Sequence, residues 1–268
     1  MSQPQKVEKV STRIWLEEPE PTNSFAARNA WLHGYDVYGE MLGRARWADM
    51  MYLLFRGEAP TKAQAALLDA LSLVLANAGP RDPAVHAAMC GAVGGSTAAS
   101  CLMAALAVGA GRLGGGREVL SAMQAWEHCG LELEAWQRHL STPPAEAASV
   151  WPTTEHAAGF EAHGAGMAGI VRQALSYLAS ISPGPRLGWL FEQRHALALA
   201  AGSSPAMTGV AAAALADLGF KPAQGEMLYL LLRLPGAAAH ALEQGETGHK
   251  QFPFFQLDLL DDPGKASA

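Results

Sequence analysis

The chain has 268 residues, of which 50% are hydrophobic, 16% are charged and 7% are aromatic. This composition excludes an intrinsically disordered protein and a small disulfide-stapled module. The net charge of −6 gives no basic surface of the kind that binds nucleic acid. The chain contains 52 alanines but only three isoleucines. Because alanine favours helices and β-branched residues favour strands, we expect an all-α chain.

Capping residues and apolar spacing place the first helices. Residues 47–55 are expected to form one helix. Thr61 and Gln64 form a capping box in front of leucines at helical spacing. A second helix should therefore begin there and stop at Gly79-Pro80.

The stretch 83–111 contains no Asp, Glu, Lys or Arg and is long enough to span a bilayer. It consists mainly of small residues rather than Leu, Ile or Phe, and basic residues flank both of its ends, Arg81 and Arg112. The Gly-x-x-x-Gly spacing at 91–95 is typical of helices that pack closely. We therefore expect a pair of close-packed buried helices here, with no membrane span.

The C-terminal helices are expected after residue 200. Ser204 should cap a helix over 205–218, and Gly219 should end it. A break at Pro235 is expected to separate the next helix from an Ala-rich final helix around His240.

The middle of the chain, between about 118 and 200, is less regularly patterned than its flanks. We interpret it as a small domain inserted into a larger helical dimerisation domain. The small domain would cover 118–201, the large one 12–117 plus 202–255, and the tails 1–11 and 256–268. Loops are expected at three Gly- or Pro-rich stretches, 114–116, 141–154 and 182–188.

The cysteines and the N-terminal residues indicate the compartment. Cys90, Cys101 and Cys129 are too few for a disulfide framework, which favours a reducing environment. The first 15 residues are polar and contain no hydrophobic segment of the kind found in signal peptides. We therefore expect a cytoplasmic protein.

Several motifs with known chemistry are too weak to assign a function. The G-x-G-x-x-G matches at 109–114 and 164–169 follow no predicted strand, so no dinucleotide site is expected. His240 and Glu243 stand one helical turn apart, but two ligands do not make a zinc site, and we expect no metal.

A cluster of titratable residues in a Gly-rich loop leaves two alternatives open. His156, Glu161 and His163 could perform acid–base chemistry or contact a ligand. Loops of this composition are more often simply solvated. The residues by themselves therefore indicate a helical protein whose role stays open.

The C-terminal third resembles a known family. The segment AALADLGFKPAQGEMLYLLLRLPGAAAHALEQ is similar to the closing helices of the citrate synthase superfamily, with its DLGF.P … R.pG..AH..EQ pattern. The opening segment resembles the family's start through the LL.GE.P turn, and NAGP at 77–80 falls where citryl-CoA lyases and the lyase module of ATP-citrate lyase carry a DHGP-like motif. GRLGGG at 111–116 is similar to the Gly-rich turn that follows. The resemblance spans roughly residues 12–255, and the short length fits the citryl-CoA lyase branch.

This resemblance implies an all-α homodimer whose large and small domains close over an acyl-CoA thioester. The family makes or breaks a carbon–carbon bond between an acetyl-CoA enol and oxaloacetate. An aspartate takes the α-proton, one histidine stabilises the enolate oxygen and a second histidine moves a proton at the oxaloacetate-derived oxygen. Coenzyme A would enter as a substrate or ligand, with no tightly bound cofactor.

The family's catalytic positions carry other residues in this chain. The histidine of the DHGP-like motif falls on Ala78, and the aspartate of the family's NVD segment falls on Thr208. The histidine of the GFGH loop falls on Ala162, although a slip of one residue would place it on His163. Alanine and threonine cannot replace an imidazole and a carboxylate as proton carriers, and each such loss costs about 10²–10⁴ in rate.

The family's carboxylate-binding arginines are only partly kept. Arg233 matches the arginine of the R.pG..AH pattern. The arginine of the family's DPR segment is missing, with Arg172 as the nearest substitute. The arginine that the family donates across the dimer has no clear match, and Lys250 is the closest cation.

Two functions therefore stay open. The first is an enzyme that acts on citryl-CoA or a related acyl-CoA through a relocated set of His163, Glu161 and Arg233. The second is an inactive paralogue that binds acyl-CoA or a carboxylate, or that completes a hetero-oligomer with an active relative. The residue chemistry favours the second. The sequence leaves the acyl group, the assembly and the pathway undetermined.

Overall fold

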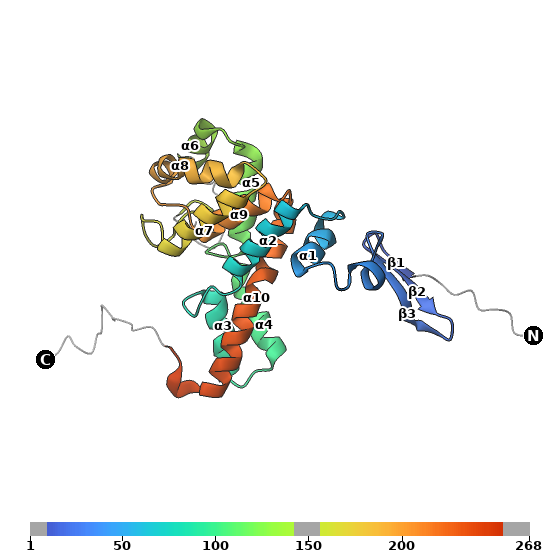
Figure 1. Ribbon diagram of the computed structural model, residues 1–268. Coiled ribbons are helices and arrows are strands. Elements are labelled where there is room, and N and C mark those ends of the chain that lie inside the picture. The colour runs from blue at the N-terminus through green and yellow to red at the C-terminus, as the bar shows by residue number, and fades with distance from the viewer. Residues whose placement is uncertain (1–9, 142–155, 254–268) are drawn as a thin grey trace, which may run out of the picture. The chain divides into compact units, whose positions relative to one another are not determined.

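The computed structural model describes residues 10–141 and 156–253 (Figure 1). Most of these residues are helical. The helices are α1 (Trp47–Arg56), α2 (Lys62–Leu75), α3 (Pro83–Val93), α4 (Ala98–Gly109), α5 (Gly116–Cys129), α6 (Leu133–Ser141), α7 (Gly169–Ile181), α8 (Arg186–Ala201), α9 (Met207–Asp217) and α10 (Pro222–Thr247).

A small antiparallel sheet precedes the helices, and the composition did not predict it. Its four strands, in the order β1-β2-β3-β4, are Val10–Ser11, Trp15–Glu20, Asn23–Leu32 and Tyr35–Asp36. His33 and Gly34 connect β3 to β4 with positive φ angles of 47° and 89°, the geometry of a tight hairpin turn. A whole-chain composition averages over so short a segment. The helical prediction is therefore correct from α1 onward, and the sheet is an addition.

Contacts between residues divide the chain into two compact units. Of the described residues, the first unit comprises 10–76, 109–141 and 156–232, and the second comprises 77–108 and 233–253. Helix α10 carries residues of both. These divisions differ from the expected domains 12–117 plus 202–255 and 118–201, which stay a prediction.

The core of the first unit is built around α9, and α5 packs along it. Residues 208–215 are all buried, including four consecutive alanines at 211–214. Small side chains on every face let the neighbouring helices approach α9 closely. This burial gives the Ala-rich composition a structural role.

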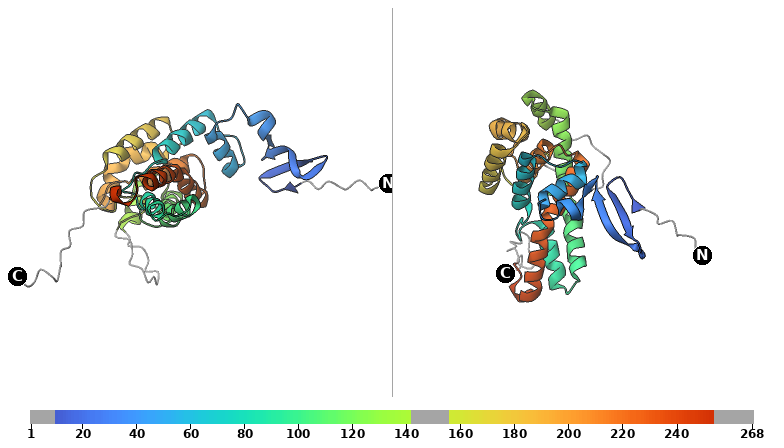
Figure 2. Two further views of the ribbon diagram at one scale, coloured as in Figure 1. Left: turned by 90° about the horizontal axis from the view of Figure 1, so that it is seen from below. Right: turned by 45° about the vertical axis from the view of Figure 1, so that its right-hand side comes forward.

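The second unit has its own smaller core. Helices α3 and α4 lie beside the C-terminal half of α10 (Figures 1 and 2). A Cβ on Gly91 would lie 3.2 Å from the sulfur of Cys101, so close packing at this glycine is confirmed. Gly95 instead lies in the turn after α3, with a φ of 77°. No helix within the described residues is long and apolar enough to cross a membrane.

Three expected helix boundaries are wrong. Helix α2 ends at Leu75, four residues before Gly79. Helix α9 begins at Met207, because Pro205 forms a β-bridge with Phe160 and the Ser204 hydroxyl donates to the carbonyl of Ala165. Helix α10 does not break at Pro235 but continues through it. Proline removes one backbone hydrogen bond, and the buried residues on both sides keep the helix in place.

The remaining local predictions agree with the structure. Helix α2 begins with the Thr61–Gln64 capping box, and Gly219 follows α9 with a φ of 79°. Two predicted loops appear in shifted form, at 111–115 and 182–185. The third, 141–154, lies almost entirely outside the described residues.

Candidate functional site

A buried carboxylate, Glu118, lies at the centre of a polar cluster in the first unit. Helix α5 starts at Gly116, directly after the Gly-rich turn, and Glu118 is in its first turn. An acidic residue at this position interacts favourably with the helix dipole. The residue is only 3% exposed, and its Oε2 accepts a hydrogen bond of 2.6 Å from the amide of Gly114. The turn and the helix therefore hold this carboxylate inside the fold.

Two further donors come from segments far away in the sequence. The amide of Gly159 donates to Oε1 of Glu118 at 3.0 Å, and the Thr208 hydroxyl donates to the same oxygen at 2.7 Å. Nε2 of His156, whose side chain is 8% exposed, lies 3.5 Å from Oε2. Each carboxylate oxygen thus has two polar neighbours. A buried charge needs such partners to offset its lost hydration.

Two glycines allow the loop to approach α9. Gly159 has a φ of 89°, a conformation that favours glycine. A Cβ on Gly159 would lie 3.0 Å from Cα of Gly209, and a Cβ on Gly209 would overlap the carbonyl of Gly159. The absence of side chains at both positions therefore brings the loop amide within reach of Glu118.

The loop also places a second carboxylate beside the cluster. Glu161 is half-buried, and its amide donates to the carbonyl of Ser204 at 2.8 Å. Burial raises the pKa of Glu161, and the charge of Glu118 raises it further, while His163 and His156 oppose the shift. His163 itself is exposed. The structure thus brings together the three titratable residues that the sequence singled out in this loop.

The other catalytic positions implied by the resemblance lie in less constrained surroundings. Ala162 and Ala78 are both exposed. Thr208 is 3% exposed and is committed to Glu118. Of these positions, Thr208 alone is part of the buried cluster.

The second unit contains a separate polar group. Arg233 is 9% exposed, and its guanidinium is paired with Asp82, which also caps α3 by accepting from the amides of Ala84 and Val85. Nε2 of His240 lies 3.1 Å from the side-chain oxygen of Asn77. Arg233 therefore already binds a carboxylate supplied by the chain itself.

Two other predicted residues of the second unit are less involved. Nδ1 of His240 lies 3.4 Å from Glu243, the pair that the spacing suggested. No group of three His, Cys, Asp or Glu side chains in the described ranges could hold a metal ion. Lys250 is exposed in a short 3₁₀ turn, His249–Gln251. Glu161 and His163 belong to the first unit, whereas Arg233 and Lys250 belong to the second.

Sequence reasoning missed Glu118 and Asp82. Both have a local signal, because Glu118 follows a Gly-rich turn and Asp82 precedes the proline that opens α3. Their partners, Thr208 and Arg233, lie 90 and 151 residues away. Only the folded chain shows that both carboxylates are paired and that Glu118 is buried.

Solved structures share this architecture. Citryl-CoA lyase from Hydrogenobacter thermophilus is similar over 95% of this chain and 98% of its own, with a TM-score of 0.69 and 16% sequence identity. ATP citrate lyase from Methanothrix soehngenii, in complex with citrate and coenzyme A, matches 96% of the chain with a TM-score of 0.68 and 14% identity. A mutant ATP citrate lyase from Methanosaeta concilii, in complex with (3S)-citryl-CoA, gives the same values.

These comparisons establish the fold. The chain spans 43% of the length of the two ATP citrate lyase chains. No protein-family model matches the sequence, and a comparison with curated proteins finds no match. At 14–16% identity the likeness concerns the backbone alone. The predicted citrate synthase-like helical fold is confirmed.

Proposed function

We propose that this protein binds a coenzyme A thioester or a citrate-type carboxylate and does not cleave or form the carbon–carbon bond. The observation that carries this proposal is the hydrogen bond from Thr208 to Glu118. Thr208 occupies the position where the resemblance implies a catalytic aspartate. A proton acceptor is therefore replaced by a donor that is already committed.

Glu118 does not supply the missing base. Its oxygens each have two polar neighbours, and the side chain is 3% exposed. A general base must come within hydrogen-bond reach of the substrate proton and must have a lone pair to accept it. Ala78 and Ala162 add no proton carrier at the two histidine positions. The loss of two or three such groups removes the mechanism, since each typically contributes about 10²–10⁴ in rate.

Carboxylate binding is supported by the second unit. Asp82 holds the Arg233 guanidinium in a nearly buried position, where a charge-assisted pair is strong. A ligand carboxylate at this guanidinium would compete with Asp82. Asp82→Asn removes the competing charge but keeps an oxygen that can cap α3. This variant should bind citrate more tightly, and Arg233→Ala should bind it more weakly.

One experiment separates binding from catalysis. Purified protein is assayed for citryl-CoA cleavage and for exchange of the α-protons of acetyl-CoA, and its melting temperature is measured with acetyl-CoA and with citrate. A rise in melting temperature without turnover is the expected result. Turnover by the wild-type protein would contradict the proposal that it is inactive. A melting temperature that neither ligand changes would contradict the proposal that it binds them.

A second candidate is a lyase that uses the loop. The raised pKa of Glu161 is the observation that favours it, because an acid–base catalyst needs a pKa near the working pH. Glu161 and His163 would then carry the protons. This candidate predicts turnover that is lost in Glu161→Gln and in His163→Ala. Unchanged turnover in both variants would exclude it.

We also propose that the protein assembles, either as a homodimer or with an active relative. The resemblance supports this, because the family builds its site from two chains. Analytical ultracentrifugation of the purified protein distinguishes a monomer from a dimer. Citryl-CoA cleavage that increases when an active relative is added would support the hetero-oligomer.

A further inference from the structure

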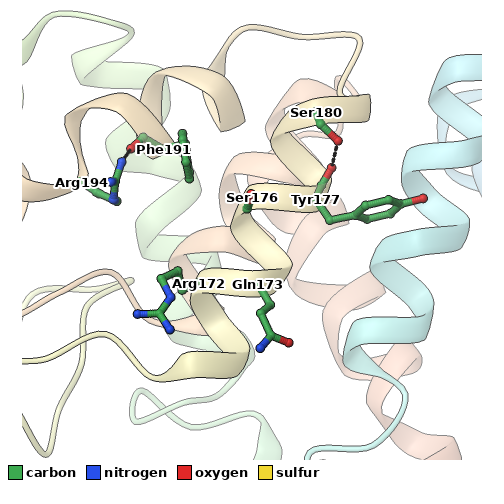
Figure 3. A pocket seen from close by; sticks show the side chains of 7 residues that line it. All are labelled: Arg172, Gln173, Ser176, Tyr177, Ser180, Phe191 and Arg194. Atoms are coloured by element: carbon green, nitrogen blue, oxygen red, sulfur yellow. Dashed lines mark hydrogen bonds between the residues drawn. The ribbon is translucent and has the colours of Figure 1, made fainter.

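A cavity of about 590 Å³ opens between α7 and α8 in the first unit (Figure 3). Arg172, Gln173, Ser176 and Tyr177 line it from α7, and Phe191 and Arg194 line it from α8. The volume is within the range of small-molecule sites, roughly 300–1,000 Å³. This cavity contains none of the residues of the Glu118 cluster or of the Arg233–Asp82 pair.

The charge of the cavity is opposite to that of the chain. Two arginines face it, and none of the described residues that line it is acidic. The whole chain has a net charge of −6. Two guanidiniums that line one cavity without an acidic side chain give it a positive potential, so an anion bound there would be stabilised.

Arg194 is held in place for such a ligand. Its guanidinium carbon lies 4.5 Å from the centroid of the Phe191 ring, and its Nη1 donates to the carbonyl of Phe191 (Figure 3). These contacts fix the plane of the guanidinium, which lowers the entropy lost on binding.

Arg172, unlike Arg194, is not held by a partner within the described residues. Its guanidinium forms no hydrogen bond or ion pair with any residue in the part of the chain that the structure describes. Arg172, Ser176 and Ser180 recur every four residues, so they lie along one face of α7. The Ser180 hydroxyl donates to the carbonyl of Tyr177 at 2.7 Å, which fixes its orientation. This face of α7 therefore presents a cation and a hydroxyl group, that of Ser176, to the cavity.

We propose that the α7–α8 cavity binds a phosphate-bearing small molecule. A phosphate has three or more acceptor oxygens and up to two negative charges, and it suits the planar fork of arginine. Two arginines can each engage a phosphate group, and the hydroxyl of Ser176 can donate to a phosphate oxygen. This site does not depend on the proposed function.

Titration with inorganic pyrophosphate at constant ionic strength tests the site, with calorimetry as the readout. The wild-type protein should bind, and Arg172→Ala and Arg194→Ala should each weaken binding by about tenfold, because each removes a charge-assisted contact. Arg172→Lys should recover part of the affinity, since lysine keeps the charge but loses the fork. Arg44→Ala, at an exposed arginine outside the cavity, is the matched control and should bind like the wild type.

The outcomes that overturn the proposal are distinct. They are no binding of pyrophosphate by the wild type, equal loss in the Arg44 variant, or equal affinity for sulfate. Urea denaturation checks that each variant is folded, and glutamine at the same position (Arg172→Gln or Arg194→Gln) replaces an alanine variant that is not. ADP and coenzyme A as further titrants identify the source of the phosphate. Failure here leaves the citrate measurement with the Arg233 variant unaffected, so carboxylate binding and phosphate binding fail separately.

Discussion

The Glu118 cluster and the α7–α8 cavity use charge in opposite ways within the same unit. Glu118 is buried, and its oxygens are surrounded by the amides of Gly114 and Gly159, by Thr208 and by His156. In the cavity, Arg172 has no partner among the described residues. A charge that the fold satisfies internally positions segments relative to one another. A charge that the fold leaves unmatched can attract a ligand.

The partners of Glu118 are all supplied by the chain itself, which fits a structural role for the cluster. A carboxylate whose oxygens are hydrogen-bonded inside the fold holds its neighbours in place and is not presented to a substrate. Substitutions in the cluster should therefore lower the free energy of unfolding and leave ligand binding in the cavity unchanged. Substitutions in the cavity should do the reverse.

The largest effect is expected for Glu118→Ala. It leaves the amide of Gly159 and the hydroxyl of Thr208 buried without an acceptor. Each unsatisfied donor costs about 1–3 kcal/mol, so we expect a loss of roughly 3–5 kcal/mol in the free energy of unfolding, measured in urea. Glu127→Ala, at an exposed position on the same helix, is the matched control and should stay within about 0.5 kcal/mol. Equal stability of the two variants would contradict the structural role of Glu118.

The close approach of the loop to α9 gives the second prediction. A methyl group at Gly209 would overlap the backbone of Gly159, so Gly209→Ala should destabilise the protein by about 2–3 kcal/mol. Gly188→Ala is the control, because Gly188 is also helical but has no atom within 4 Å of the added Cβ. That variant should gain up to about 1 kcal/mol from helix propensity. A gain at both positions would mean that the loop does not pack on α9 in this way.

A smaller loss is expected for Thr208→Val. Valine keeps the shape of threonine but removes the 2.7 Å hydrogen bond to Glu118. Because Gly159 and Gly114 still donate to the carboxylate, we expect a loss of about 1–2 kcal/mol. A double-mutant cycle with Glu118→Ala isolates the pairwise energy of this bond. A coupling energy of zero would separate Thr208 from the cluster.

The sequence was informative wherever the deciding contacts are local. The Thr61–Gln64 capping box and the αL glycine at 219 each depend on neighbours within a few residues, and both predictions are correct. Helix α10 passes through Pro235 because packing outweighs a local preference.

The site was less predictable than the fold because its contacts are long-range. The donors that stabilise the buried Glu118 carboxylate include Gly159 and Thr208, which are 41 and 90 residues away in the sequence. The resemblance identified Thr208 as a changed position but did not reveal what the threonine binds. The α7–α8 cavity had no sequence signal at all beyond two arginines on different helices.

The smallest effect is expected for Glu161, a half-buried carboxylate beside the Glu118 cluster. Glu161 has a pKa raised above its ordinary value of 4.5, first by burial and then by the charge of Glu118. The folded state therefore holds the proton more tightly than the unfolded state does. The stability linked to Glu161 is fully present below the unfolded pKa and is lost as the pH rises through the folded pKa.

Glu161→Gln should accordingly melt slightly higher than the wild type at pH 8, and this difference should shrink towards pH 4. Glu127→Gln measures the background effect of removing one exposed negative charge from α5. A difference for Glu161→Gln that is constant between pH 4 and pH 8 would mean that this carboxylate is solvated like any surface residue, and it would remove the support for an acid–base role.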